Sequence, residues 1–425
     1  MTQIMQTLRA SFTPLRQRNF RTYLSGQAIS LLGTWMQVTA QSWVVWGLSG
    51  STVALGIVSM LGSLPILLFS LWAGVWLDRL DRRKVLIASQ TSAMLLAFML
   101  AALVATGTVQ LWHVYVLSFL LGCVTAIDFP AQQAFIGDLS GVGEVRKAIV
   151  VNAMVMQIGR MLGPALAGFI VHGYGAALAF ALNGISFLAV IYTLSIVRAQ
   201  QVRSPNSGRS IGAVLDGLRF IKSQPRVQDV ILFAMIVTFF GLSLLNFFPA
   251  LADEVLHGDA QTLGLLLASS GAGALIGSTI VAPLAQSVRR IGRVLTLAAL
   301  WAGTWYIAAS FSRSIPMTML CIFIVSLAVP TVLTTANGLL QVLAPPNMRG
   351  RLLSAFIIVS FGIQPIAALF VGFMANHFGT PAAILINGTA MIIAATLMIT
   401  LRRELRHWEA PRPSDTVPPH PRPRA

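Results

Sequence analysis

Two ionisable residues, Asp128 and Arg160, fall inside apolar stretches that are long enough to cross a bilayer. Charged side chains at such positions are costly, and in membrane proteins they mark ion pairs, proton sites or binding sites. At a rise of about 1.5 Å per helical residue, their depths differ by an amount that an arginine side chain can span. Three interpretations stay open: a structural ion pair, a proton site at Asp128 tuned by Arg160, and contact between Arg160 and an anionic substrate.

A second group of charges lies between two apolar stretches, in residues 74–84 with the sequence GVWLDRLDRRK. A turn that only anchors basic side chains at a membrane surface needs no acid, so Asp78 indicates a further role. We expect this loop to work through charge pairs. Its candidate residues are Gly74, Asp78, Arg79, Arg82 and Arg83.

Small residues recur in the stretch that contains Arg160. Gly159, Gly163, Pro164 and Gly168 form a ladder that lets helices approach closely, and the proline adds a kink. Ordinary close packing would explain the ladder equally simply.

Polar side chains follow two stripes of helical spacing. In the stretch near residue 35 they recur at intervals of three and four residues, and a similar stripe lies near residue 335. Such faces avoid lipid, so they either hydrogen-bond to neighbouring helices or line a wet cavity, and we expect a cavity. Among the tryptophans of this stretch, Trp35 is the better candidate for stacking on a planar ligand. The candidate cavity residues are Gln27, Thr34, Trp35, Gln37, Gln41, Asn246, Thr334, Asn337, Gln341 and Gln364.

Residue patterns typical of enzymes are missing from the sequence. It has no phosphate-binding Gly-x-x-x-x-Gly-Lys loop, and its six histidines lack metal-ligand spacing. No Ser-His-Asp arrangement is defensible. We therefore expect no catalytic residues, no metal and no cofactor.

The elements that hold these residues follow from composition. Hydrophobic residues make up 56% of the 425 residues, charged residues 10%, and the mean hydropathy is +0.77. Soluble domains carry about 25% charged residues, so a soluble fold is excluded. Twelve stretches of spanning length are predicted, and they must be helical to satisfy their backbone groups. The predicted class is an all-α membrane protein.

The charge distribution predicts the orientation. All of the 29 lysines and arginines except Arg160 and Arg313 fall in the termini or in every second loop. The positive-inside rule then places both termini of a multi-pass protein in the cytoplasm. The net charge of +16 is explained by contact with membrane lipids rather than with nucleic acid.

The chain divides into two halves. Residues 1–200 form one predicted six-helix bundle and residues 228–401 another, and several Gly, Phe and Asn positions of the first recur 204 residues later. Between them lies a polar linker, residues 201–227, with an expected amphipathic helix over 211–223. Residues 402–425 are rich in Pro and Arg, and we expect a disordered cytoplasmic tail.

The 74–84 segment resembles the loop between helices 2 and 3 of the major facilitator superfamily, although Asp81 stands where that family usually has Gly. The resemblance implies that Asp78, Arg79 and Arg82 hold the cytoplasmic side closed. The Gly159–Gly168 ladder is similar to an element of facilitator exporters. Residues 18–23 (RNFRTY), 33–37 (GTWMQ) and 128–135 (DFPAQQAF) look like the enterobactin-exporter branch, the transmembrane secretion effectors.

The resemblance covers about residues 16–400 and implies the major facilitator fold and a location in the bacterial inner membrane. It also implies a monomeric secondary exporter of small amphipathic molecules, of the siderophore or drug class, by proton antiport and alternating access. Uptake or a lysophospholipid-type carrier is one alternative. A membrane sensor or assembly partner that does not transport is another.

Overall fold

The computed structural model describes residues 12–77, 80–141, 143–197, 211–286, 288, 290–345 and 348–402. Within these ranges the chain forms helices and no strand. The helices of the first half are η1 (Thr13–Arg16), α2 (Arg18–Ser49), α3 (Thr52–Leu77), α4 (Arg82–Ala105), α5 (Leu111–Ser140), α6 (Val145–Tyr174) and α7 (Ala176–Ile196). Those that follow are α8 (Ile211–Ser223), α9 (Pro225–Phe240), η2 (Leu242–Phe247), α10 (Phe248–Ala250), η3 (Leu251–Val255), α11 (Ala260–Ile276), η4 (Gly277–Val281), α12 (Ala282–Gln286), α13 (Ile291–Phe311), α14 (Ile315–Leu343), α15 (Arg349–Gly362), α16 (Gln364–Phe378) and α17 (Thr380–Leu401).

Eleven segments of the described chain are long and apolar enough to cross a membrane. The 32-residue α2 packs among them, but its polar stripe makes it less apolar, so it is the twelfth. Three crossings of the second half combine several helices: Pro225–Val255, Ala260–Gln286 and Gly350–Phe378. The predicted all-α class is confirmed. The predicted linker residues 198–210 and the tail residues 403–425 lie outside the described ranges.

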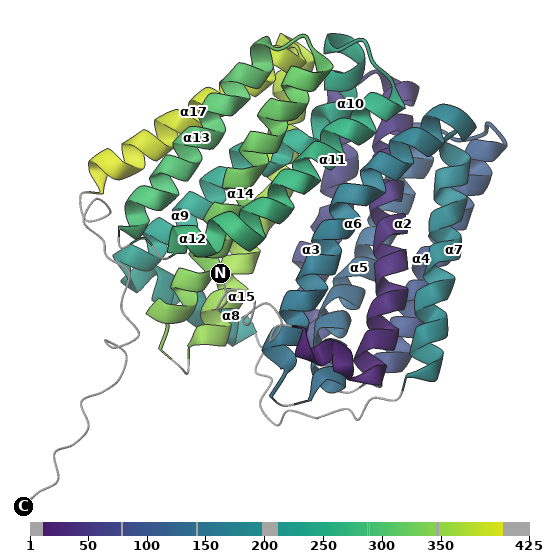
Figure 1. The fold of residues 1–425 in the computed structure, drawn as a ribbon, viewed down its shortest axis with the longest axis horizontal. Helices are drawn as coiled ribbons and strands as arrows, with labels where there is room; N and C mark the ends of the chain where they lie inside the picture. The colour runs from purple at the N-terminus through teal and green to yellow at the C-terminus, as the bar shows by residue number, and fades with distance from the viewer. Residues whose placement is uncertain are drawn as a thin grey trace, which may run out of the picture.

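The crossings gather into two bundles that lean together at one end and diverge at the other (Figure 1). In one bundle α2 packs on α6 and α7; in the other α13 packs on α14 and α17. Two helix pairs join the bundles, α6 with α11 and α3 with α16. We call the end where α2 starts and α7 ends the linker side, and the end where α2 stops and α11 starts the far side.

The two joining pairs carry related glycines. A side chain at Gly168 would meet the backbone oxygen of Ala260 at 2.7 Å, and one at Gly372 would meet that of Thr52 at 2.9 Å. The turns that follow are also alike, since Gly175 and Gly379 have φ of 85° and 82°. These pairs are 204 residues apart, so the structure repeats the sequence pattern at the contacts between the bundles.

The first crossing of the second half is broken. Helix α9 ends at Phe240, and a 3-10 turn (η2) and a π-helical turn (η3) follow before the loop. Pro249 lacks a backbone N–H, so a regular helix cannot continue through it unchanged. Such irregular backbone occurs in membranes where it is buried in protein or lines a cavity.

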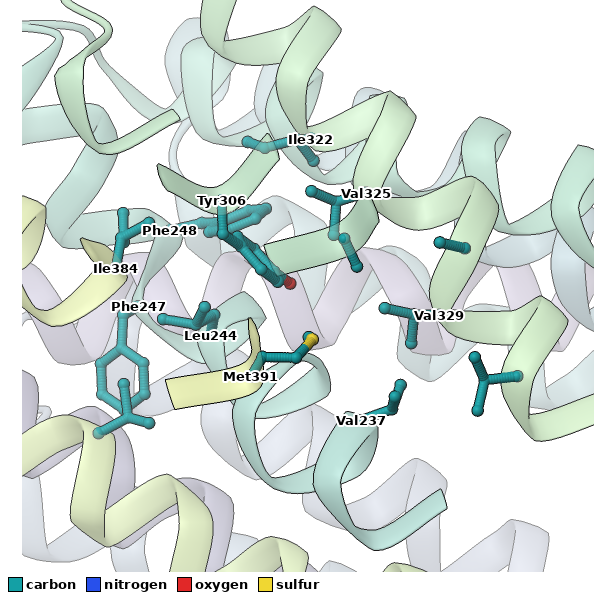
Figure 2. Packing of buried hydrophobic residues seen from close by; sticks show 14 of the residues in the cluster. Val237, Leu244, Phe247, Phe248, Tyr306, Ile322, Val325, Val329, Ile384 and Met391 are labelled. Atoms are coloured by element: carbon teal, nitrogen blue, oxygen red, sulfur yellow. The ribbon is translucent and has the colours of Figure 1, made fainter. Parts of the chain in front are cut away.

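Around this break, side chains of η2, α10, α13, α14 and α17 pack into one apolar cluster (Figure 2). Tyr306 of α13 is its polar member, and its hydroxyl donates to the Gly241 carbonyl at 2.8 Å. That bond ties α13 to the junction between α9 and η2. The cluster thus fixes the broken segment that faces the other bundle.

Helix α8 has the bounds that the sequence predicts for an amphipathic helix. It packs on α15, and a side chain at Gly217 would meet the Arg351 carbonyl oxygen at 2.5 Å. Asp216 accepts a bond from Arg351 at 2.8 Å. The helix is therefore docked on the second bundle as well as amphipathic.

Candidate functional site

A cavity of about 250 Å³ lies between the two bundles. Its walls come from α2 and α6 on one side and from η2, α11 and α16 on the other. The lining residues are Trp35, Val38, Thr39, Ser42, Arg160, Pro164, Leu242, Leu245, Asn246, Leu267, Ser270 and Gln364. Three of the predicted cavity residues, Trp35, Asn246 and Gln364, therefore line the same cavity. A second, smaller space of about 10 Å³ adjoins Arg160, Ser270 and Tyr306.

Arg160 lies over the ring of Trp35, with 5.6 Å between the guanidinium carbon and the ring centroid. The small-residue ladder makes this contact possible. A side chain at Gly163 would meet the Trp35 Cβ at 2.6 Å, and one at Gly159 would meet the Trp35 ring at 3.4 Å. The two glycines therefore seat α2 against α6, whereas Gly168 packs against α11. Within the described chain, the Arg160 guanidinium has no hydrogen-bond or salt-bridge partner.

Asp128 lies within the first bundle, among polar side chains. Its carboxylate accepts bonds from Ser89 at 2.5 Å, from Gln90 at 3.0 Å and from Gln132 at 2.5 Å. Gln27 extends the network by donating to Gln132 at 3.0 Å. We call these five residues the Asp128 network.

The ion pair between Asp128 and Arg160, one of three interpretations of the sequence, is not formed in this structure. No salt bridge joins them among the described residues, because the acid is held by the helices α4 and α5 and the arginine faces the cavity. The two groups therefore need separate explanations.

The polar stripe of α2 serves mainly to hold helices together. Gln37 accepts from Asn183 at 2.6 Å, and Gln41 donates to Ser118 at 2.9 Å. Thr34 bonds to the Ser30 carbonyl of its own helix. With Gln27 in the Asp128 network, none of these predicted cavity residues lines the cavity. In this structure the four side chains hydrogen-bond to protein groups, which was the other interpretation of the stripe.

The stripe of α14 is also absent from the cavity wall. Gln341 donates to Asn337 at 2.7 Å, and Thr334 is exposed. These three predicted cavity residues lie nearer the linker side of α14 than the cavity does.

On the linker side, the charged loop is bonded within the first bundle. Arg82 pairs with Asp138 of α5 at 2.8 Å, with both side chains largely buried. Arg83 donates to the carbonyls of Leu194 and Ser195 at the end of α7, where a cation complements the helix terminus. Gly74 lies in α3, while Asp78 and Arg79 lie outside the described residues.

Asp81 stands where related loops usually have glycine, and the structure shows what it does there. Its carboxylate accepts from the backbone N–H groups of Arg83 at 3.0 Å and Lys84 at 3.3 Å, so it caps the start of α4. The turn is formed with aspartate in place of glycine.

Three polar contacts join the bundles within the described chain, and all lie on the far side. Trp46 donates to Asp253 at 2.8 Å, and Thr52 donates to the Gly372 carbonyl at 2.8 Å. His172 and Asp259 approach to 2.5 Å. We did not predict a role for Asp253 and Asp259 from the sequence. Both lie in one short segment on the side with few basic residues, and this clustering could have indicated an ionic contact there.

Asp259 also caps α11 through the backbone N–H of Thr262. Partial burial opposes its ionisation, but that bond and the neighbouring His172 together hold the pKa of the Asp259 carboxyl below its ordinary value. The far-side contact therefore favours a charged acid.

Comparison with known proteins places this geometry in a family. Residues 9–423 match the family model described as transmembrane secretion effector. The Staphyloferrin A transporter of Staphylococcus aureus (strain NCTC 8325 / PS 47) is 23% identical over 90% of this chain and 96% of its own length. Macrolide efflux protein A of Streptococcus pyogenes is 23% identical over 91% and 96%. Enterobactin exporter EntS of Escherichia coli O1:K1 / APEC is 24% identical over 93% of each.

Solved structures share the fold. A bacterial homologue of the human lysosomal transporter Spinster, in an inward-facing and occupied conformation, superposes with a TM-score of 0.74 at 16% identity. The match covers 92% of this chain and 97% of the other. The nucleoside transporter NupG gives a TM-score of 0.73 at 11% identity, over 91% and 99%. The chain is thus a multi-pass bacterial membrane protein with the fold of a transporter, and it belongs to the transmembrane secretion effector family of the major facilitator superfamily.

Proposed function

We propose that this protein exports small amphipathic molecules of the siderophore or drug class, with protons moving in the opposite direction. The observation that carries the proposal is the cavity between the bundles, whose polar bridging contacts lie on the far side. Bundles joined at one end and divergent at the other fit one state of an alternating-access cycle (Figure 1). The names of the siderophore exporters and efflux pumps among its relatives support this cargo class.

In this proposal the linker side faces the cytoplasm of the inner membrane, as the basic residues of that side favour. A single chain works alone, in contact with lipid. Cargo enters from the cytoplasm, and breaking the far-side contacts while the linker-side ends approach releases it outside. The 74–84 loop then stabilises the alternative state, in which the cytoplasmic side is closed.

Asp128 is our candidate for the proton site. The carboxylate accepts bonds only from neutral side chains, and no salt bridge involves it within the described chain. A proton is then the counter-charge available to it. The amide oxygen of Gln90 is buried without a partner, so rotation of this amide would offer an acceptor to a protonated acid.

The test uses the full chain in liposomes that contain a pH-sensitive dye, with siderophores, macrolides and cationic dyes offered under an imposed pH gradient. We expect substrate-dependent proton movement in the wild type and its loss in Asp128→Asn. Asp216→Asn, an exposed acid on α8, is the matched control and should behave as wild type. Substrate movement with no accompanying proton movement would reject antiport.

A further inference from the structure

The chemistry of the cavity selects among amphipathic cargoes. Arg160 carries a guanidinium, which keeps its positive charge in proteins. It lines both spaces between the bundles, yet no described residue bonds to it. A cation at membrane depth normally has a partner, and the absence of one among the described residues points to a partner that comes from outside.

The remaining lining residues reinforce this charge. None of the twelve residues that line the larger cavity is an acid, so the single arginine leaves the wall with one uncompensated positive charge. Two further donors face the same space without a recorded hydrogen bond, the indole N–H of Trp35 and the amide of Gln364. Their donor groups suit acceptor oxygens.

The shape of the site adds an apolar requirement. Leu242, Leu245 and Leu267 form the apolar part of the wall contributed by the second bundle, and the Trp35 ring lies beneath the guanidinium. A carboxylate can take two parallel bonds from a guanidinium, a geometry that a lysine cannot offer. A flat apolar group attached to that carboxylate would then meet the leucines and the indole.

We propose that the cavity is a binding site for organic anions, in which Arg160, held over the Trp35 ring, binds an acidic oxygen group joined to an aromatic or apolar body. This inference rests on the proposed export function and names its substrate class. It predicts discrimination against cations and neutral compounds of the same shape. Gly159 and Gly163 act as positioning residues, because they bring the Trp35 ring against Arg160.

Three probes of one shape test this. They are 1-naphthaleneacetate, the neutral 1-naphthaleneacetamide and the cationic 2-(1-naphthyl)ethylammonium, titrated calorimetrically into the full chain in nanodiscs of zwitterionic lipid, with empty nanodiscs subtracted. We expect the anion to bind at least about tenfold more tightly than the other two. Arg160→Gln should abolish that preference and Arg160→Lys should retain part of it. Arg313→Gln, the same change in a far-side loop, should leave it intact.

A second variant covers the case in which Arg160→Gln fails to fold. Ser270→Asp adds an acid to the same two spaces and should cancel the preference by giving the arginine an internal partner. Equal binding of the three probes to the wild type, stronger binding of the cation, or an unchanged anion preference in both cavity variants would overturn the proposal.

Transport in liposomes separates this inference from the proposed function. If a neutral or cationic compound is exported while binding has no anion preference, export stands and the substrate class is wrong. If the anion preference depends on Arg160 but no compound crosses the membrane, the binding site stands and export is wrong.

Discussion

Asp128 and Arg160 are both ionisable residues of membrane-crossing helices, but their surroundings differ. Asp128 accepts bonds from three side chains of its own bundle, whereas Arg160 rests on one indole ring and faces a cavity shared by both bundles. The carboxylate of Asp128 has hydrogen-bond donors within its own bundle, whereas the guanidinium of Arg160 has no hydrogen-bond or salt-bridge partner among the described residues. A charge with internal partners should matter for stability, and a charge without them should matter for binding.

Arg82 provides the strongest contrast with Arg160, because it is an arginine whose partner is present. Its pair with Asp138 is largely buried, so Arg82→Gln breaks a buried ion pair. We expect the free energy of unfolding to fall by about 3–5 kcal/mol. Arg160→Gln should change it by less than about 1 kcal/mol or raise it, since it removes an unpaired charge. Denaturant unfolding in detergent micelles checks both.

The double variant Arg82→Gln with Asp138→Asn is the matched control, and it should recover part of the loss because both charges of the pair are then removed together. The contrast between the two arginines would be broken if Arg160→Gln were as destabilising as Arg82→Gln.

Removing the charged member of the Asp128 network should also lower the free energy of unfolding, by a smaller amount. Asp128→Leu leaves the donors of Ser89, Gln90 and Gln132 without their acceptor, so stability should fall by about 1–3 kcal/mol. Asp128→Asn keeps one acceptor oxygen and should lose less. Thermal unfolding of the two variants side by side measures the difference, and equal stability would mean that the network carries little of the packing energy.

The sequence predicts the class of fold, the twelve crossings and the bounds of α8 because each depends on local patterns of polarity. It also predicts cavity positions for Trp35, Asn246 and Gln364, and it gives substrate contact as one of three interpretations of Arg160. Charged or bulky amphipathic side chains within apolar helices have few other places to lie.

The partners of the α2 stripe could not be read in the same way. Helical spacing shows that Gln27, Gln37 and Gln41 share a face, but their partners lie 105, 146 and 77 residues away on α5 and α7. Periodicity defines a face without naming the helix opposite. The far-side contacts could not be predicted for a related reason. His172 lies in the last turn of α6 and Asp259 at the start of α11, and only the approach of the bundles joins them.

Gly163 tests how the ladder supports the arginine. A methyl group there would lie 2.6 Å from the Trp35 Cβ and 2.9 Å from the Leu32 carbonyl oxygen, so Gly163→Ala must push α2 away from α6. The ring of Trp35 then moves from beneath Arg160. We expect naphthaleneacetate binding to weaken by roughly threefold to tenfold, in line with a loss of about 0.5–2 kcal/mol for a disturbed cation–π contact.

Gly173→Ala, where an added methyl meets nothing within 4 Å, is the control and should bind as wild type. Unchanged binding in Gly163→Ala would show that the position of the indole is unimportant, and the site would reduce to Arg160 alone.

The smallest effect should come from the exposed pair on the far side. The pKa of Asp259 is lowered when the bundles are joined on the far side. The ionised carboxylate therefore stabilises the joined state fully at pH values above its ordinary pKa. That stabilisation is lost as the pH falls through the lowered pKa. Because Asp259 and His172 are 44% and 57% exposed, the pair should contribute less than about 1 kcal/mol.

Spin labels at Thr106 and Ser314, in a variant without Cys123 and Cys321, report the separation of the bundles on this side. Acidification toward pH 3 should increase the population of longer distances, and Asp259→Asn should show that population already at neutral pH. If the distances in Asp259→Asn still respond to acid as in the wild type, another acid such as Asp253 controls the far side.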